Sequence, residues 1–546
     1  MSPRIFGLQT ECSATPSRFE GGRAGGQEPL LGIQSLFIPA FKFTLSHKMD
    51  QPENDLIAQR RAKLEALRGR NIEPFGSGFE TSGSIAEVRS KFKDGEILRA
   101  AGRITAHRDM GRSHFIDLRD ATGRIQVYLH EKEMGQNMEV FRLLDLGDFI
   151  GVEGVCFLTK TGELTLKVRD FQVLAKSIRP LPEKWHGLQD IEARYRQRYL
   201  DLITNEQSRA VFEKRILILR EMRRFLEDRG FQEVETPILQ AVAGGAAAEP
   251  FKTHHNALGL DLYLRIAPEL YLKRLLVAGF NKVFELNRNF RNEGISRRHN
   301  PEFTMLEVYW AYADFGKIAD LVEEMVCHLA EKVLGLQTAA ATENGAGKRG
   351  ALLIEHRNAE GQVVRTLNLQ RPWRRARYHD LVRGVAGEDW FELTSEQRRH
   401  RAMQDLKVEI MPQLADFEVT QHVFEKLVEE KTFDPLFVTH CPKELVPLAK
   451  QNRENDALVD VYELIINGVE ISPGYTELND PDTQRRRLLE QAGEETQKID
   501  EEFLVALEHG MPPAGGFGLG VDRLTMLLTG TESIRDVILF PLLRPK

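Results

Sequence analysis

The stretch 282-KVFELNRNFRNEGISRRHNPEFTMLEVYWAY-312 decides the fold, because it contains two strand-like runs joined by a basic loop. In a strand over 283–293, successive side chains alternate between two faces, so the apolar residues share one face. The loop 294–301 then turns the chain, and 302–312 is predicted as the returning strand. The polar face of the first strand carries Glu285, Asn287, Asn289, Arg291 and Glu293.

On the returning strand, Phe303, Glu307 and Tyr309 share one face. A strand pair whose polar face holds charges of both signs and two aromatic rings is typical of a ligand-binding surface. The alternative is an exposed sheet face held together by salt bridges. Met305 is interpreted as a core or interface side chain.

A second informative region is 461-VYELIINGVEISPGYTELND-480. Asn467-Gly468 between apolar runs predicts a two-residue hairpin loop. This register makes Glu463 and Glu470 diagonal neighbours, about 7–8 Å apart on one face. Two such carboxylates favour a bound Mg²⁺, unless both are simply solvated. Glu477 has the opposite parity and joins them only if the strand bends at Pro473-Gly474.

The third region is 515-GGFGLGVDRLTML-527. Glycines at 516, 518 and 520 leave one strand face bare, where a flat ring such as adenine can lie. Arg523 falls in the first turn of the following helix, where the helix dipole and a guanidinium both favour phosphate. The alternative is tight packing between helix and sheet.

Residues 96–175 contain five short alternating runs separated by glycine-containing turns. Five strands in about 80 residues favour a small closed barrel of the OB type, which binds single-stranded nucleic acid on one face. Residues 53–70 before it form a predicted amphipathic helix whose polar side is basic. The helix is either a solvated surface or a contact to a phosphate backbone.

Composition limits the class of protein. The 546 residues are 42% hydrophobic and 28% charged, with a net charge of −7, which is typical of a globular protein and argues against a DNA-coating one. No apolar run approaches the ~20 residues of a membrane span, so no membrane association is expected. The four cysteines form no CxxC pair, which favours a reducing compartment. The expected location is the cytoplasm.

Four segments are predicted along the chain. Residues 1–48 are expected to be an unstructured extension, with Met49 as the true start of translation. Residues 49–180 hold the basic helix and the barrel, and 181–205 form a linker whose start is marked by the two prolines of 178-IRPLPEKWHGLQD-190. Residues 206–546 form the main domain. Within it we predict a helix over 206–229, a strand over 231–237 and a hairpin near 357–362.

These regions resemble the signature motifs of class II aminoacyl-tRNA synthetases, here 216-ILILREMRRFLEDRGFQEVETPIL-239, 290-FRNE-293 and 515-GGFGLGVDR-523. Further stretches are similar to those of class II lysyl-tRNA synthetases: 244-GGAAAEPF-251, 265-RIAPELYLKR-274 and 474-GYTELND-480. The resemblance runs from about residue 53 to the end. It implies an α+β fold: an N-terminal OB-fold β-barrel that binds the anticodon, followed by a class II synthetase catalytic domain with a central antiparallel β-sheet flanked by helices.

The resemblance also implies a homodimer that joins L-lysine to tRNA(Lys) through a lysyl-adenylate, with ATP as substrate and Mg²⁺ as cofactor. By resemblance, Arg291 contacts the lysine carboxylate and the α-phosphate, and Arg523 contacts the γ-phosphate. Phe303 stacks on adenine, and Glu293 and His299 hold adenine or phosphates. Glu463 and Glu470 match the Mg²⁺ ligands. The implied lysine-binding residues are Gly245, Glu269, Glu307, Tyr309, Tyr475 and Glu477, and the implied anticodon contacts are Phe115, Gln126 and Glu163.

One position departs from the family pattern, which often has Asn where this chain has Pro473. Three alternatives share parts of the architecture. Aspartyl- and asparaginyl-tRNA synthetases have the same domains, but they would need a cationic site for aspartate where this chain has Glu477. A non-catalytic tRNA-binding relative would be expected to lack Arg291 or Arg523, and both are present. A lysyl ligase that modifies a translation factor would lack the barrel.

Overall fold

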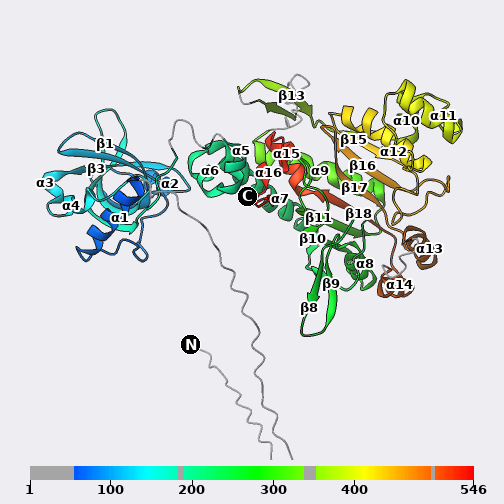
Figure 1. Cartoon of the computed structure of the whole chain (residues 1–546), viewed down its shortest axis with the longest axis horizontal. Helices are drawn as coiled ribbons and strands as arrows, with labels where there is room; N and C mark the ends of the chain where they lie inside the picture. Colours follow the sequence, from blue (N-terminus) through cyan, green and yellow to red (C-terminus); the bar gives the residue numbers. More distant parts are fainter. Residues whose placement is uncertain are drawn as a thin grey trace, which may run out of the picture. The chain divides into compact units, whose positions relative to one another are not determined.

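The computed structural model describes residues 55–182, 188, 190–246, 248–336, 352–358, 360–492 and 499–545. The chain divides into two compact units, residues 1–180 and 181–546, and each is described by itself (Figure 1). The expectations for residues 1–48 and for a start at Met49 lie outside the described residues. In the part of the chain that is described, no helix is long and apolar enough to cross a membrane.

The first unit is a closed five-stranded barrel with strand order β1-β2-β3-β5-β4, which confirms the predicted OB-type barrel. Alternation along each strand buries one face, so that Ile116, Leu118, Ile125 and Val127 point into the barrel core. The strands are β1 (Ile97–Asp109), β2 (Ser113–Arg119), β3 (Arg124–His130), β4 (Phe149–Leu158) and β5 (Leu164–Ala175). The helices are α1 (Asp55–Arg68), α2 (Ile85–Ser90), α3 (Glu131–Met134) and α4 (Asn137–Phe141).

Helix α1 forms where the basic amphipathic helix was predicted, but its basic residues are not all on the solvent side. Leu64 and Leu67 are buried, and so is Arg60, while Leu56 is half exposed. The Arg60 guanidinium donates to the carbonyl oxygens of Leu146 (3.0 Å) and Ser177 (3.0 Å), and so ties α1 to the barrel. This arginine was expected on the polar face; the long side chain instead satisfies loop carbonyls beneath the helix.

The second unit is built on an eight-stranded sheet with the order β14-β15-β16-β17-β18-β11-β10-β6. Neighbours from β15 to β10 are antiparallel, as predicted, whereas the two outermost pairs are parallel, so the sheet is mixed. Its strands are β6 (Gln232–Glu233), β10 (Lys282–Phe290), β11 (Glu302–Ala311), β14 (Arg374–Arg377), β15 (Leu436–Thr439), β16 (Val461–Ile466), β17 (Val469–Thr476) and β18 (Ala514–Gly520).

Helices cover both faces of this sheet. On one face α7 (Glu206–Glu227), α9 (Phe315–Leu334) and α15 (Val521–Thr529) pack on the even-numbered residues of β11, such as Leu306 and Val308. On the other face α8 (Glu269–Val277) and α14 (Glu501–Glu508) pack near Tyr309. The remaining helices are α5 (Ile191–Arg196), α6 (Arg198–Thr204), α10 (Tyr378–Ala386), α11 (Ser395–His400), α12 (Asp416–Leu427), α13 (Pro481–Ala492) and α16 (Ile534–Val537).

Short elements complete the second unit. Pairing of β12 with β13 confirms the hairpin predicted near 357–362. The short strands are β7 (Leu239–Gln240), β8 (Lys252–His255), β9 (Leu260–Leu264), β12 (Leu353–Arg357) and β13 (Val363–Asn368), and the short turns of helix are η1 (Trp390–Glu392), η2 (Arg401–Asp405) and η3 (Glu429–Lys431).

Three predicted elements differ from the structure. The strand predicted over 231–237 is only the two residues of β6, and β10 ends at Phe290 rather than at residue 293. Most of the predicted linker is helical, as α5 and α6. Asp190 caps α5 by accepting from the Glu192 backbone N–H, and buried Arg198 pairs with Asp201 at 2.8 Å and donates to the Arg535 carbonyl. These buried polar bonds attach the segment to the second unit.

Candidate active site

A register shift in the β16–β17 hairpin places the acidic residues of this region on one face. Ile465 pairs with Glu470, as predicted, but Leu464 pairs with Ser472, so one residue of β17 is extra. An extra residue reverses the alternation of side chains beyond it. Glu463 therefore pairs with Pro473, and Tyr475 shares its face. The change of parity that Glu477 needed comes from this bulge and not from a bend at Pro473-Gly474.

Glu477 is buried in a cluster of acidic and aromatic side chains from α8, β11 and the end of β17. Its Oε2 is 2.6 Å from Lys273 Nζ, which is also 2.7 Å from Glu269 Oε1. The Tyr475 hydroxyl donates to Glu269 Oε2 at 2.8 Å. Burial raises the pKa of Glu477, while the Lys273 ammonium acts in the opposite direction. The cluster thus contains carboxylates that water does not solvate, a setting that favours binding of cations.

Glu307 adds a third carboxylate to this buried cluster. Its Oε2 accepts a hydrogen bond from the Tyr309 hydroxyl at 3.2 Å, and both residues are buried. Burial, and then the neighbouring Glu269, raise the pKa of Glu307 to about 8. The same causes raise the pKa of Tyr309. Two carboxylates close together in a dry site cannot both ionise without a compensating cation.

Two glycines make room for these side chains. At Gly516 a Cβ would lie 2.3 Å from Glu477 Oε1 and 2.7 Å from the Tyr309 ring. Gly245 has a φ of +89°, and a Cβ there would lie 3.3 Å from the Glu269 Cβ. The structure therefore brings together all six residues predicted to bind lysine, five by their side chains and Gly245 by its backbone. Lys273, which contacts two of them, was not anticipated.

A cavity adjoins β11, β17 and the start of α15. It is lined by all five residues predicted to bind ATP: Arg291, Glu293, His299, Phe303 and Arg523. The Arg291 guanidinium lies 5.2 Å from the centroid of the Phe303 ring, within the range of a cation–π contact.

Arg523 is held at the wall of this cavity by several contacts. It donates to the Glu470 carbonyl at 2.8 Å and lies 3.3 Å from His299 Nε2. Burial, and then the Arg523 charge, lower the pKa of His299, which keeps the imidazole neutral near pH 7. Burial lowers the pKa of Arg291, and the charges of Glu293 and Glu307 oppose that effect. Guanidinium groups so placed are suited to phosphate.

The glycine strip of β18 serves this cavity only in part. Gly520 lines it, whereas Gly516 abuts Glu477 and a Cβ at Gly518 would lie 2.9 Å from the methyl group of Met305. Met305 itself lines the cavity, so its interpretation as a core or interface residue was wrong. It has the same parity as Phe303 and Glu307, and that parity could have indicated its position.

Glu463 and Glu470 are the residues predicted to hold a metal. Burial, and then the charges of Glu470 and Glu429, raise the pKa of Glu463. Glu429 in η3 was not anticipated; its Oε1 accepts the Glu470 backbone N–H at 3.2 Å. Among the described residues, no group of three or more side chains forms a complete protein cage for a metal. Hard carboxylate oxygens in an incomplete shell fit Mg²⁺, which usually binds through one or two carboxylates and substrate phosphates.

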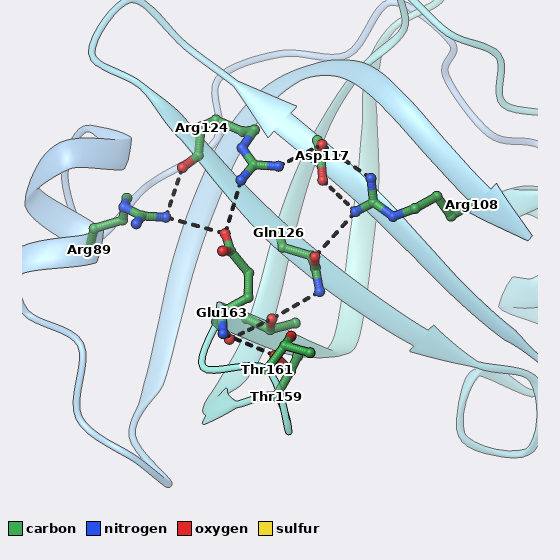
Figure 2. A network of polar contacts seen from close by, with 9 residues as sticks. Arg89, Arg108, Asp117, Arg124, Gln126, Thr159, Thr161 and Glu163 are labelled. Carbon is green, nitrogen blue, oxygen red and sulfur yellow. Dashed lines mark hydrogen bonds and ion pairs between the residues drawn. The ribbon is translucent and has the colours of Figure 1, made fainter.

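The barrel carries a separate polar surface on strands β2 and β3 (Figure 2). The Phe115 ring lies 4.9 Å from the Tyr128 ring. Gln126 Oε1 accepts from Arg108 at 3.2 Å, and its Nε2 donates to Thr165 at 3.2 Å. Glu163 accepts from Arg124 at 3.1 Å. Phe115 and Gln126 therefore lie on the outward side of β2 and β3, and Glu163 directly precedes β5.

Asp117 holds this surface together, as Figure 2 shows. Its carboxylate is 2.8 Å from Arg108 and 2.9 Å from Arg124. Burial alone would raise the pKa of Asp117, but hydrogen bonds from the two arginines lower it overall. Since Arg108 also donates to Gln126, its position fixes which way the Gln126 amide points.

Comparison with known proteins agrees with this arrangement. The model of the family "tRNA synthetases class II (D, K and N)" matches residues 190–544, and that of the "OB-fold nucleic acid binding domain" matches residues 98–174. The lysine--tRNA ligase of Carboxydothermus hydrogenoformans is 46% identical over 505 residues, covering 91% of this chain and 99% of that protein. Those of Pelotomaculum thermopropionicum (47%; 90% and 96% covered) and Staphylococcus aureus (45%; 91% and 100% covered) are similarly close. The chain therefore belongs to the class II aminoacyl-tRNA synthetases, in the lysine--tRNA ligase family.

Proposed function

We propose that this protein attaches L-lysine to tRNA(Lys) in two steps, with ATP as the source of energy. The observation that carries the proposal is a cluster of buried carboxylates next to a cavity lined by two arginines. Free lysine brings two ammonium groups, which can balance the carboxylates of Glu269, Glu307 and Glu477. Aspartate would add another anion, and asparagine would leave the carboxylates unbalanced, so the aspartyl and asparaginyl alternatives are disfavoured.

The first step needs no general base in this arrangement, because the lysine carboxylate is already ionised at pH 7. One of its oxygens attacks the α-phosphorus of ATP, the bond to the β-phosphate oxygen breaks, and pyrophosphate leaves. Arg291 is assigned to the lysine carboxylate and the α-phosphate, and Arg523 to the γ-phosphate. Phe303 stacks on adenine, while Glu293 and His299 contact adenine or phosphates. Alignment and charge neutralisation then account for most of the rate.

Glu463 and Glu470 would hold Mg²⁺, which neutralises phosphate charge when bound. In the second step a ribose hydroxyl at the 3′ end of the tRNA attacks the lysyl carbonyl carbon, and AMP leaves. We assign selection of the tRNA to Phe115, Gln126 and Glu163 on the barrel, because a stacked ring and a fixed amide are the groups that read single-stranded bases.

We further propose that the protein is a homodimer in the cytoplasm. Ile216 on α7 is 64% exposed, on the side of the helix opposite to the buried residues Ile218 and Met222. We assign this exposed side chain, together with the partly buried Leu219 on the same helix, to the dimer interface. The three described cysteines are free, which suits a reducing compartment.

Amino-acid-dependent exchange of pyrophosphate into ATP tests the proposed activity. Lysine should support exchange, whereas aspartate and asparagine should not. Exchange with aspartate but not with lysine would refute the assignment of the buried carboxylates to the ammonium groups of lysine. If none of the amino acids supports exchange, the result would favour a non-catalytic tRNA-binding protein.

A further inference from the structure

Lys273 is a buried cation placed between two of the carboxylates proposed to bind substrate. Its side chain has no exposed surface, and its Nζ lies 2.7 Å from Glu269 Oε1 and 2.6 Å from Glu477 Oε2. The Nζ also lies 5.6 Å from the centroid of the Tyr475 ring. The two carboxylates come from different elements, since Glu269 begins α8 and Glu477 follows β17. Lys273 is therefore the ionic link between the helix and the strand end.

We propose that Lys273 is a positioning residue that determines specificity for lysine, a role that rests on the function proposed above. Its ammonium pairs with Glu269 and Glu477, favours the charged form of Glu477 and fixes the separation between the two carboxylates. In this role the substrate's α-ammonium and ε-ammonium meet two carboxylates that are already charged and correctly spaced. Lys273 does not contact the reacting atoms; it acts through the two glutamates.

The surroundings of Glu477 show why a resident cation is needed. Glu269 and Lys273 face it from α8, Tyr309 and Glu307 belong to the adjoining strand β11, and Tyr475 is on its own strand. The glycine at 516 adds no charge from β18. Without such a cation, three carboxylates buried together would take up protons, because burial disfavours every added negative charge. A protonated carboxyl cannot pair with the ammonium group of the substrate.

Fixed spacing also bears on chain length. The distance between two carboxylates selects the length of a diammonium substrate, and ornithine is one methylene shorter than lysine. If both carboxylates are held by one rigid buried ammonium, ornithine can satisfy only one of them. Loosening the pair should therefore weaken lysine binding more than ornithine binding. This loss of discrimination is a result that a general loss of packing would not produce.

The test uses the full-length Lys273→Met protein, with Lys332→Met, an exposed lysine on α9, as the matched control. Lysine- and ornithine-dependent pyrophosphate exchange are measured between about pH 6 and 9, together with ATP affinity. We expect ATP affinity to be unchanged, the KM for lysine to rise about tenfold or more, and the lysine-to-ornithine preference to fall. Because Glu477 must be ionised to bind an ammonium, we also expect a change on the acid side of the pH profile. As the pH is lowered, kcat/KM for lysine in the variant should begin to fall about one pH unit above the point where it falls in the wild type.

A lysine KM, preference and pH profile equal to those of the wild type would overturn the proposal. So would a parallel loss of lysine and ATP binding, because that is the behaviour of a purely structural residue. If Lys273→Met does not fold, Lys273→Ala is prepared with propylammonium, which can occupy the vacated space. Recovery of lysine-dependent exchange with the amine would support the proposal, and failure to recover it would overturn it. Absence of lysine-dependent exchange in the wild type would instead mean that the proposed function itself is wrong.

Discussion

Gly516 lies against the carboxylate of Glu477, at a distance that leaves no room for a methyl group. A Cβ at this position would come within 2.3 Å of Glu477 Oε1. The close approach lets β18 pass directly beneath the proposed ε-ammonium site. We expect Gly516→Ala to displace Glu477 and to cost about 1–3 kcal/mol in lysine binding, as overpacking does elsewhere.

The matched control for this change is Gly518→Ala on the same strand. Its added methyl group would meet only the flexible end of Met305, at 2.9 Å. Lysine affinity, measured by pyrophosphate exchange at varied lysine concentration, should fall in Gly516→Ala and change much less in Gly518→Ala. Equal effects of the two substitutions would contradict the close packing of Gly516 against Glu477.

Glu307 should make the stability of the lysine-free protein depend on pH. Its pKa is raised to about 8, first by burial and then by Glu269. The folded state therefore keeps a proton that the unfolded state releases near pH 4.5, so stability is lost as the pH rises toward 8. The contribution is about 1.4 kcal/mol per pH unit within that window.

Glu307→Gln removes this titration while still accepting the Tyr309 hydrogen bond. Chemical denaturation at about pH 6 and pH 8.5 should therefore show a smaller loss of unfolding free energy in Glu307→Gln than in the wild type. At the same time lysine activation should weaken, because one carboxylate is gone. An identical pH dependence in both proteins would show that Glu307 is already ionised in the folded state.

The barrel surface should affect tRNA but not amino-acid activation. We expect Phe115→Ala to weaken tRNA binding by about 1–3 kcal/mol through loss of base stacking. Gln126→Ala should act in the same direction, while Gln136→Ala, an exposed glutamine of the same unit, should not. Steady-state aminoacylation at varied tRNA concentration measures the effect, and lysine-dependent pyrophosphate exchange should stay at the wild-type level. A loss of exchange in these variants would mean that the barrel residues support folding instead.

The exposed face of α7 should control association. Ile216→Glu places a charge at a side chain that is 64% exposed, so the single chain should tolerate it while a dimer interface should not. Sedimentation should give the mass of a dimer for the wild type and of a monomer for this variant. Val505→Glu on α14, where the valine is 48% exposed, is expected to leave the dimer intact. Dimers in all three proteins would place the interface elsewhere.

Local patterns predicted most of the fold because the elements obey simple periodicities. The barrel strands, α7 and the Asn467-Gly468 hairpin follow from alternation, helical spacing and turn chemistry. The bulge at β17 could not be read from the sequence, because polar and apolar residues are mixed in 469-VEISPG-474 and fit both registers equally well. The helices α5 and α6 in the predicted linker were not anticipated. Pro180 and Pro182 are typical of a linker, whereas the helical signals, the Asp190 cap and the apolar positions that follow it, come later in the segment.

The site was predicted less completely than the fold. Individual carboxylates could be assigned, but their common partner could not. Lys273 lies on α8 and reaches Glu477 from a distant part of the chain, and single-sequence patterns contain no information about such contacts. Arg60 is a similar case, since a basic residue on an amphipathic helix is usually solvated, whereas here loop carbonyls bind it.

The most direct test of the account replaces the acid that is assigned to the ε-ammonium group. The glutamine in Glu477→Gln has nearly the shape of glutamate but lacks its negative charge. The ε-ammonium of bound lysine would then be buried without a partner, which costs about 3–5 kcal/mol. Glu502→Gln, an exposed acid on α14, is the control. The account predicts that Glu477→Gln still binds ATP but shows almost no lysine-dependent pyrophosphate exchange. Exchange at the wild-type rate and lysine concentration would contradict it.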